Sequence, residues 1–469
     1  MEFLNRSSEL SLLQQRLESG RAEFLVLYGR RRVGKTELLA YLAGQMRSLY
    51  FEATDTVPAQ QLRDLTVELS RVSGNQLLQV QPLTSWEAAL TAITQFVGTE
   101  RTLVVFDEFQ FLAAKSPELE TTISRWWRTT GRDLPIVFVL AGSELSFFED
   151  KVLAGSLYGR RTGQLKLEPF TARDAALFHP GYSAEDKVRT FSVCGGIPYY
   201  LERFTDDHPL RDHLLSEVFE RTGLLHDEAE LMLRQSIADP ANHIAVLRSI
   251  AQGHNRNSKI ADRTGLTAAH ITKILTSLER LGLAATLRPI TASPRTKKTA
   301  YTITDEFLRF HYRFVEPARS QLRTSALAAT YLDNSVIPAL DHHASITWEE
   351  ICRQYVLREA AGATAVGRWW GQVRMGSGPQ TEEREIDVVA VDGDRTVVAI
   401  GMCKWTNSTV DFDELNLLDR LTPAMEGFSG QASRYLFSRN GFTSRLEKHA
   451  DSDPALHLVT PADIYADVP

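Results

Sequence analysis

The sequence predicts an α/β protein of several domains, with a parallel sheet near its start and a second α/β domain at its end. Three observations carry this prediction. Short apolar runs alternate with helical segments from residue 24 to residue 140, which is typical of a doubly wound parallel sheet. From residue 170 to residue 281 the pattern is helical. Apolar strands return at residues 385–390, 396–403 and 433–437, after a helix that begins at residue 348 with two acids.

Length and composition set the outer bounds. A chain of 469 residues is too long for one small core, and its 43% apolar and 24% charged residues are ordinary for globular proteins. No stretch approaches ~18 uninterrupted apolar residues, and the N-terminal segment lacks the pattern of a secretory signal. Cys194, Cys352 and Cys403 fit no zinc-binding spacing. We therefore expect a cytoplasmic protein with reduced thiols and no membrane contact.

A glycine-rich loop follows the first apolar strand, residues 24–28. Residues 29–36 read GRRRVGKT and fit G-x-x-x-x-G-K-[ST], the phosphate-binding loop. Glycine has no Cβ, so successive N–H groups can curl around a phosphate, and the helix at residues 37–46 points its N-terminus at the same anion. Lys35 would reach the β- and γ-phosphates, and the Thr36 hydroxyl would ligate Mg²⁺. The predicted ligands are ATP and Mg²⁺, with nucleotide contacts at Gly29, Arg32, Val33, Gly34, Lys35, Thr36 and Glu37.

A second buried strand, residues 102–106, ends in two carboxylates. An Asp-Glu pair in this place is usually just a strand end, but it follows the glycine loop by about seventy residues. That spacing indicates that Asp107 holds the Mg²⁺ shell and that Glu108 orients or deprotonates the attacking water. Ser143 follows a further strand at residues 135–140. It is either a polar sensor beside the γ-phosphate or the N-cap of a helix.

Arginines and then helices follow the predicted sheet. Arg160 or Arg161 could reach the γ-phosphate, in the same chain or in a neighbour within a homo-oligomer; the alternative is an ordinary surface loop. Residues 170–238 are predicted to be helical, with N-caps at Thr171 and Ser183 and a sharp stop at Gly195-Gly196. A helical segment placed here suggests a lid over a nucleotide site.

Residues 243–315 predict a winged helix-turn-helix with an excess of positive charge. Three helices, at residues 244–251, 258–264 and 267–281, precede a hairpin at residues 283–304. The segment has twelve Lys and Arg against four Asp and Glu, so it carries +8 while the rest of the chain carries −15 of the net −7. The expected DNA contacts are His270 and Lys273 on the third helix, and Arg295, Lys297 and Lys298 at the hairpin tip. The alternative is a winged helix that only packs against protein.

The C-terminal segment combines an acidic helix with two charged strand residues. Glu349 and Glu350 open the helix, Asp387 lies on one strand, and Lys404 ends the next. This layout resembles that of restriction-endonuclease-like nucleases, and the resemblance implies that Asp387 and a second acid bind Mg²⁺ while Lys404 polarises a water.

Three features together resemble a known family. The start F-x-N-R-x-x-E-L, the loop YGRRRVGKT and the later GRRT, PF and GGIP elements resemble bacterial and archaeal ATPases of the AAA+/STAND group. The C-terminal pattern resembles the domain of unknown function fused to many of them, which has a restriction-endonuclease-like fold. The resemblance implies adenine contacts near Asn5 and Arg6 and a nuclease site at Glu349 or Glu350, Asp387 and Lys404. It also suggests a role in defence or in maintenance of mobile elements.

One departure from that family falls in the nuclease-like site. The family usually has Glu in G-E-C-K-W, and this chain has Met402 at that position. A thioether is a soft ligand, whereas Mg²⁺ requires hard oxygen. Glu385 lies two residues before Asp387 on the same strand face and could substitute. Otherwise the domain is a nuclease fold that does not cleave.

The sequence thus predicts five segments and leaves two hypotheses. The expected segments are a P-loop core at 1–165, a helical lid at 166–238, a winged helix at 239–317, a helical connector at 318–345 and a restriction-endonuclease-like domain at 346–469. Under the first hypothesis an ATPase couples nucleotide state to DNA binding and to DNA cleavage. Under the second, a nucleotide-switched regulator binds DNA or protein and cuts nothing.

Overall fold

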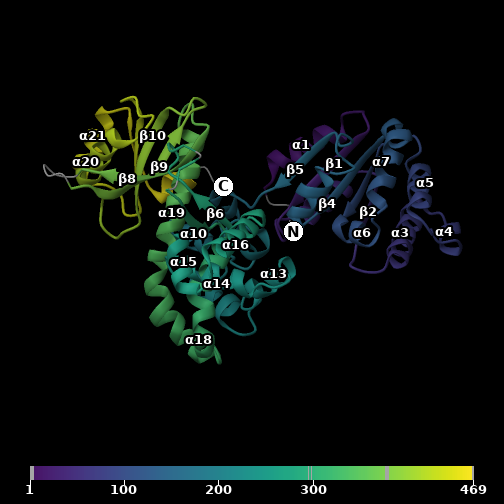
Figure 1. Ribbon diagram of the computed structural model, residues 1–469, viewed down its shortest axis with the longest axis horizontal. Coiled ribbons are helices and arrows are strands. Elements are labelled where there is room, and N and C mark those ends of the chain that lie inside the picture. The colour runs from purple at the N-terminus through teal and green to yellow at the C-terminus, as the bar shows by residue number, and fades with distance from the viewer. Residues whose placement is uncertain (1–4, 294, 297, 375–379, 467–469) are drawn as a thin grey trace. The chain divides into compact units, whose positions relative to one another are not determined.

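The structure is a computed structural model that describes residues 5–466 except 294, 297 and 375–379. The chain divides into two compact units, residues 1–169 and residues 170–469, and each is described by itself (Figure 1). Among the described residues, no helix is both long and apolar enough to cross a membrane.

The first unit is built on a five-stranded parallel sheet with the order β2-β3-β4-β1-β5. Its strands are β1 (Glu23–Gly29), β2 (Ser48–Glu52), β3 (Thr102–Asp107), β4 (Ile136–Gly142) and β5 (Gly163–Leu167). The predicted parallel sheet is confirmed. Because all strands run the same way, Gly29, Asp107 and Gly142 end at one edge, where ligands bind in such sheets. Strand β5 was not predicted, since GQLKL has no apolar run and only its last residue is buried.

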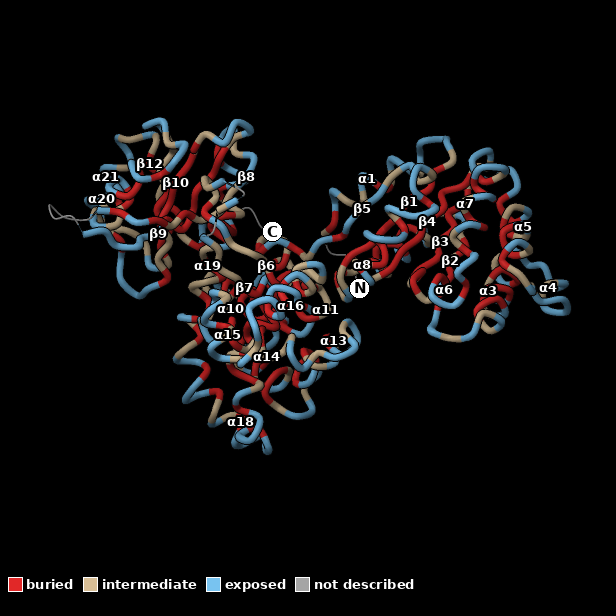
Figure 2. The backbone as a smooth tube through the Cα atoms, in the orientation of Figure 1, coloured by how far each residue is buried: buried red, intermediate tan, exposed pale blue. Residues whose placement is uncertain are grey.

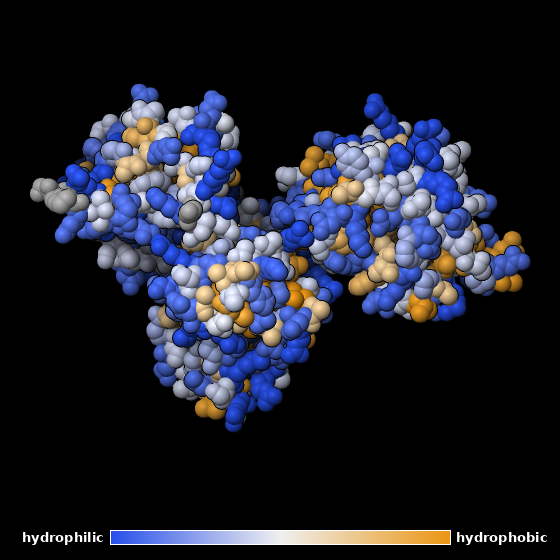
Figure 3. All heavy atoms as spheres, viewed as in Figure 1, coloured by the Kyte–Doolittle hydropathy of each residue, from blue (hydrophilic) through white to orange (hydrophobic). Residues whose placement is uncertain are grey.

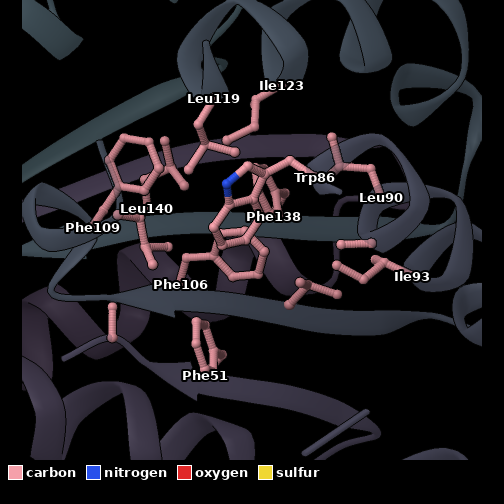
Figure 4. Packing of buried hydrophobic residues seen from close by; sticks show 14 of the residues in the cluster. Phe51, Trp86, Leu90, Ile93, Phe106, Phe109, Leu119, Ile123, Phe138 and Leu140 are labelled. Atoms are coloured by element: carbon pink, nitrogen blue, oxygen red, sulfur yellow. The ribbon is translucent and has the colours of Figure 1, made fainter. Parts of the chain in front are cut away.

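Helices cover both faces of this sheet. They are α1 (Ser7–Leu17), α2 (Lys35–Ala43), α3 (Pro58–Ser73), α4 (Leu77–Val80), α5 (Trp86–Val97), α6 (Phe109–Lys115), α7 (Leu119–Thr129) and α8 (Leu145–Phe147). On one face, α3, α5, α6 and α7 bury a cluster that includes Phe106, Phe138 and Trp86 (Figure 4). Full burial of one such side chain stabilises the fold by about 1.5–3 kcal/mol. Strands β1, β3 and β4 are buried along their whole length (Figure 2), so buried strands support the edge that carries the glycine loop.

The second unit begins with short helices. They are α9 (Ala172–Ala175), α10 (Ala184–Cys194), α11 (Pro198–Leu201), α12 (Leu210–His213) and α13 (Glu228–Ser236). Both predicted caps are present, because Thr171 accepts from the Asp174 N–H and Ser183 from the Asp186 N–H. The predicted stop after α10 is also present. A Cβ on Gly196 would lie 1.9 Å from the Phe170 carbonyl oxygen, so only glycine fits there.

Three helices and a hairpin follow in the order of a winged helix. They are α14 (Ala241–Ala251), α15 (Asn257–Thr264), α16 (Ala268–Arg280), β6 (Ala284–Leu287) and β7 (Ala300–Ile303). Gly265, with φ of 72°, ends α15, and Thr267 caps α16 by accepting from the His270 N–H. The apolar pattern of this helix predicts a core face of Ile271, Ile274, Leu275, Leu278 and Leu281. The first four are buried, while Leu281 lies just past the helix end and is half-buried.

The C-terminal sheet has the order β12-β11-β10-β9-β8. Its strands are β8 (Ala365–Val373), β9 (Glu382–Val391), β10 (Val397–Lys404), β11 (Ser433–Ser438) and β12 (Leu456–Val459). Strands β8, β9 and β10 pair antiparallel, and β10, β11 and β12 pair parallel. The three predicted strands are present, while β8 and β12 were not predicted. This mixed sheet is the second α/β element of the predicted fold.

The second unit also contains a long helix, α19 (Ile337–Glu359). Its shorter helices are α17 (Glu306–Phe310), α18 (Ser325–Tyr331), α20 (Phe412–Leu421), α21 (Ser444–Ser452) and α22 (Pro461–Tyr465). The sequence predicts that a helix begins at residue 348, after a separate connector. In the structure this helix, α19, begins at Ile337 and continues through residue 345 without a break. It continues because Leu340, Ala344 and Trp348 bury one helical stripe. One rigid helix thus leads from the connector into the C-terminal sheet.

Candidate functional site

The glycine loop turns sharply between β1 and α2. Arg32 and Gly34 have φ of 66° and 89°, both in the left-handed region, and α2 begins at Lys35. A Cβ on Gly29 would lie 2.4 Å from the Leu167 carbonyl oxygen at the end of β5, so glycine is required where the loop leaves the sheet. The turn places the first backbone N–H groups of α2 at the mouth of the loop, where a phosphate is favoured.

Lys35 is buried, with 4% of its surface exposed. Its ammonium donates to the carbonyl oxygens of Gly29, at 3.1 Å, and Arg30, at 2.8 Å. Burial lowers the pKa of Lys35 to about 8, although the nearby carboxylates of Glu108 and Asp107 act in the opposite direction. The cation is therefore incompletely compensated in the loop and suited to take an anion.

Asp107 lies at the end of β3 and is fully buried. Its Oδ2 accepts from the Thr36 hydroxyl at 2.9 Å and from the Tyr50 hydroxyl at 2.5 Å, and its Oδ1 accepts from the Glu108 N–H at 2.9 Å. Thr36 and Asp107 thus bring a hydroxyl and a carboxylate oxygen together beside the loop, which is the hard donor set that fits Mg²⁺. Tyr50 was not predicted, because nothing in β2 distinguishes it from an ordinary strand residue.

Glu108 has φ of 50°, an uncommon value outside glycine that orients its carboxylate away from the strand. Its Oε2 accepts from the Ser143 hydroxyl at 2.8 Å and from the amide of Gln110. Ser143 is therefore not a helix N-cap: that position belongs to Glu144, and Ser143 contacts the predicted catalytic acid. A Cβ on Gly142 would clash with Gln110 at 2.1 Å, so the glycine leaves room for this arrangement.

The N-terminal segment reaches the glycine loop through Arg6. This guanidinium is 5% exposed and donates to the carbonyl oxygens of Val33 and Glu168, both at 2.8 Å, and to Glu9 at 2.9 Å. Arg6 therefore links α1, the loop and the end of β5. Asn5, the other residue predicted to lie near the adenine, directly precedes Arg6 and has a φ of 63°.

The two arginines after the sheet are engaged within their own unit. Arg160 donates to the Ser124 hydroxyl at 3.3 Å. Arg161 donates to the Leu153 carbonyl oxygen at 2.8 Å and lies over the Tyr158 ring. Neither contact involves the glycine loop, so both arginines order the segment before β5 in this conformation.

The predicted DNA-contacting residues lie on the surface. His270 and Lys273 are exposed on α16, and Arg295 and Lys298 are exposed in the segment between β6 and β7. Lys297 lies outside the described residues. The face shown in Figure 3 carries hydrophilic residues together with smaller apolar patches. The exposure of these four residues makes their side chains accessible to a partner.

The C-terminal sheet borders a cavity of about 620 Å³ that Asp387, Glu349, Glu385 and Lys404 help to line. Asp387 is 8% exposed, and its Oδ2 accepts from the Cys403 N–H at 2.8 Å. Burial, followed by the negative charge of Glu349, raises the pKa of Asp387 to about 7. The structure thus gathers acids from α19 and β9 with the lysine that ends β10.

Two residues predicted for this site are held in ion pairs. Glu350 was expected to bind metal, but it pairs with Arg353 at 2.9 Å and does not line the cavity, because it lies about 100° around α19 from Glu349. Lys404 was expected to be available to polarise a water, but it pairs with Glu414 at 3.1 Å.

The remaining donors do not fit a metal. Met402 is 5% exposed and belongs to an apolar cluster, and Glu349 pairs with Arg368 at 3.2 Å. Across the part of the chain that the structure describes, no three or more His, Cys, Asp or Glu form a group that could hold a metal ion. Cys352 and Cys403 are free thiols, and burial raises the pKa of each.

Comparison with known families identifies both parts of the chain. Residues 3–204 match a family described as "ATPase domain predominantly from Archaea". Residues 311–415 match a family described as "Archaea bacterial proteins of unknown function". The chain thus carries an archaeal-type ATPase domain and a C-terminal domain of unknown function, which confirms the resemblance drawn from its motifs.

Individual proteins are similar over different lengths. An uncharacterized protein of Methanocaldococcus jannaschii is 26% identical over 413 residues, covering 86% of this chain and 87% of that protein. An uncharacterized ATP-binding protein of the same organism is 49% identical over 37 residues, covering 8% of this chain and 63% of that protein. Among solved structures, the Walker-type ATPase paby2304 of Pyrococcus abyssi is 20% identical, with 66% of this chain and 96% of that chain covered and a TM-score of 0.49.

Proposed function

We propose that this chain, which carries an archaeal-type ATPase domain, binds ATP with Mg²⁺ at the glycine loop, hydrolyses it, and uses its nucleotide state to control DNA binding by the winged helix. The observation that carries the proposal is the pair of contacts at the sheet edge. Thr36 lies 2.9 Å from Asp107, and Ser143 lies 2.8 Å from Glu108. Metal-binding oxygens and a candidate base thus lie side by side, next to the loop.

Each residue then has a defined task. On binding, the Lys35 ammonium exchanges the carbonyl oxygens of Gly29 and Arg30 for phosphate oxygens, with which it forms charge-assisted bonds. Thr36 and Asp107 would hold Mg²⁺, which neutralises phosphate charge when it is bound. The Glu108 carboxylate orients the attacking water and accepts its proton, which requires release from Ser143 or Gln110. Ser143 is then free to donate to the γ-phosphate.

Nucleotide binding is tested with Lys35→Ala. We expect binding of ATP, measured by calorimetry, to weaken by at least a hundredfold, since a buried charge-assisted contact is worth about 3 kcal/mol or more. Lys151→Ala is the matched control, because Lys151 is an exposed lysine of the same unit and should leave binding unchanged. Equal binding by the wild type and Lys35→Ala would remove the assignment.

The winged helix is proposed to bind DNA. Its support is the surplus of eight positive charges between residues 243 and 315 and the exposure of His270, Lys273 and Lys298. Charge reversal at Lys273 or at Lys298 should weaken DNA binding. Each should also reduce the slope of log affinity against log salt concentration by about one. Unchanged affinity and slope in both variants would favour a winged helix that only packs against protein.

A second candidate function concerns the C-terminal domain. The buried Met402, the Lys404–Glu414 pair and the position of Glu350 favour a nuclease-like domain that does not cleave. We therefore propose a nucleotide-switched DNA-binding regulator in preference to a nuclease. The test is cleavage of plasmid and linear DNA with Mg²⁺ or Mn²⁺. Cleavage by the wild type that is lost in Asp387→Ala would restore the nuclease hypothesis.

A further inference from the structure

The cavity beside the C-terminal sheet has a second wall that belongs to the winged helix. Asn255, Arg256, Leu287 and Ala300 line it together with residues of β8, β9 and β10. The two walls thus come from parts of the chain that are about a hundred residues apart, and any ligand in the cavity contacts both.

The two walls are fixed to each other. The Ile290 N–H donates to the Arg368 carbonyl oxygen at 2.9 Å, so the segment after β6 covers the open edge of β8. Arg395 donates to the carbonyl oxygens of Ile290, at 2.8 Å, and Ala292, at 3.1 Å, and Arg256 donates to Glu383 at 2.7 Å. Backbone and side-chain contacts therefore hold the hairpin against the sheet, and both contribute to the wall of the cavity.

The chemistry of the cavity is that of a site for single-stranded nucleic acid. A half-buried indole, Trp370, lies in the lining, and the side chains of Arg256 and Arg384 are 56% and 43% exposed. Proteins that bind single strands combine an aromatic surface on which bases stack with cations that contact phosphates. A volume of about 620 Å³ is that of a small-molecule pocket, ~300–1,000 Å³, so it admits unpaired nucleotides and excludes a duplex.

We propose that this cavity binds unpaired nucleotides of a DNA whose adjoining duplex lies on the winged helix, so that the preferred substrate is a junction between duplex and single strand. The inference rests on the proposed DNA binding by the winged helix. A base stacks on Trp370 inside the cavity, and its phosphates lie against Arg256 and Arg384 at the exposed side.

The acids of the cavity suit this orientation. Carboxylates repel phosphates. They can, however, accept hydrogen bonds from the exocyclic amino groups of bases. Glu349 is already paired with Arg368 at 3.2 Å, and Glu383 with Arg256 at 2.7 Å. Glu385 and Asp387 also line the cavity and can accept from the amino groups of a base, so bases point inward toward these acids and the backbone follows the exposed arginines.

The experiment compares the affinity of the full chain for two DNAs by fluorescence anisotropy: a blunt duplex, and the same duplex with a single-stranded overhang. The wild type should bind the overhang DNA about tenfold tighter, the effect of stacking about one base. Trp370→Ala and Arg384→Glu should abolish this preference and leave affinity for the blunt duplex unchanged. Trp370→Phe should retain it, because phenylalanine still offers a ring.

Two controls separate this inference from the proposed function. Lys448→Glu reverses an exposed charge on α21 that does not line the cavity, and it should retain the preference. Lys273→Glu should weaken binding of both DNAs equally. If the wild type binds both DNAs with equal affinity, the cavity site is overturned. If Lys273→Glu still weakens the binding of both DNAs in that case, the winged helix remains a DNA-binding element. Absence of any DNA binding would overturn both.

Discussion

The protein contains two buried aspartates on β-strands, Asp107 and Asp387, and the two differ in what surrounds the carboxylate. Asp107 meets the hydroxyls of Thr36 and Tyr50, within 2.9 Å and 2.5 Å. Asp387 meets a backbone N–H, and burial together with Glu349 raises its pKa to about 7. Two hydroxyls and a backbone N–H donate to the first carboxylate, whereas burial and a neighbouring acid disfavour the charged form of the second.

This difference teaches that residue types at the right spacing do not by themselves make a metal site. In the ATPase domain, a hydroxyl from α2 and a carboxylate from β3 converge beside an anion-binding loop. In the C-terminal cavity, Arg368 neutralises Glu349 and burial raises the pKa of Asp387, so less negative charge is available to bind a cation. The predictions below test whether the two sites are really unequal.

The largest expected effect is the loss of hydrolysis in Glu108→Gln. Removal of a general base should lower ATP turnover by about 10²–10⁴-fold, while ATP binding stays within a few-fold of the wild type. Glutamine keeps the size of the side chain and an oxygen that Ser143 can donate to. Steady-state turnover and calorimetric binding, measured on the same preparations, check this. Turnover near the wild-type value would show that Glu108 is not the base.

Met402→Glu should destabilise the C-terminal domain without creating a nuclease. The substitution places a carboxylate in an apolar cluster at a position that is 5% exposed, and we expect the free energy of unfolding to fall by about 2–4 kcal/mol. Met402→Leu keeps the apolar volume and should cost less than about 1.5 kcal/mol. Urea unfolding measures both. Appearance of Mg²⁺-dependent DNA cleavage in Met402→Glu would instead show that one missing acid was all that the cavity lacked.

The affinity for ATP should fall as the pH rises through about 8. Phosphates bind the protonated form of Lys35, whose pKa burial lowers to about 8 in the ligand-free protein. Affinity is therefore fully present below that pH and declines above it, by up to about tenfold per pH unit. Lys35→Arg stays protonated throughout, so its affinity should not change with pH in this range. A flat profile for the wild type would mean that Lys35 remains charged without a ligand.

Much of the ATPase domain could be predicted because its signals are local. The apolar runs that became β1 to β4 and the pattern GRRRVGKT are contiguous in sequence, and the Asp-Glu pair ends one of these runs. Gln110 and Tyr50 could not be predicted, since each acts only through a partner brought near by the fold. Strand β5 gave no signal because it forms a partly exposed sheet edge.

The C-terminal cavity was harder to predict because its details depend on helical phase and on distant contacts. Glu349 and Glu350 are equivalent as sequence, and only the start of α19 at Ile337 and the packing of Trp348 decide which one faces the sheet. The pairing of Lys404 with Glu414 depends on how α20 folds back on β10. The winged-helix wall of the cavity depends on the contact between Ile290 and β8, and no local sequence pattern predicts that contact.

The most direct test of the inequality between the two sites is the rate of ATP hydrolysis as a function of Mg²⁺ concentration in Asp107→Asn and Asp387→Asn. The two substitutions are chemically identical, and each replaces a carboxyl group with an amide. We predict that Asp107→Asn loses Mg²⁺-dependent turnover while Asp387→Asn keeps the wild-type rate and the wild-type dependence on Mg²⁺. Normal turnover in Asp107→Asn, or loss of it in Asp387→Asn, would contradict the account.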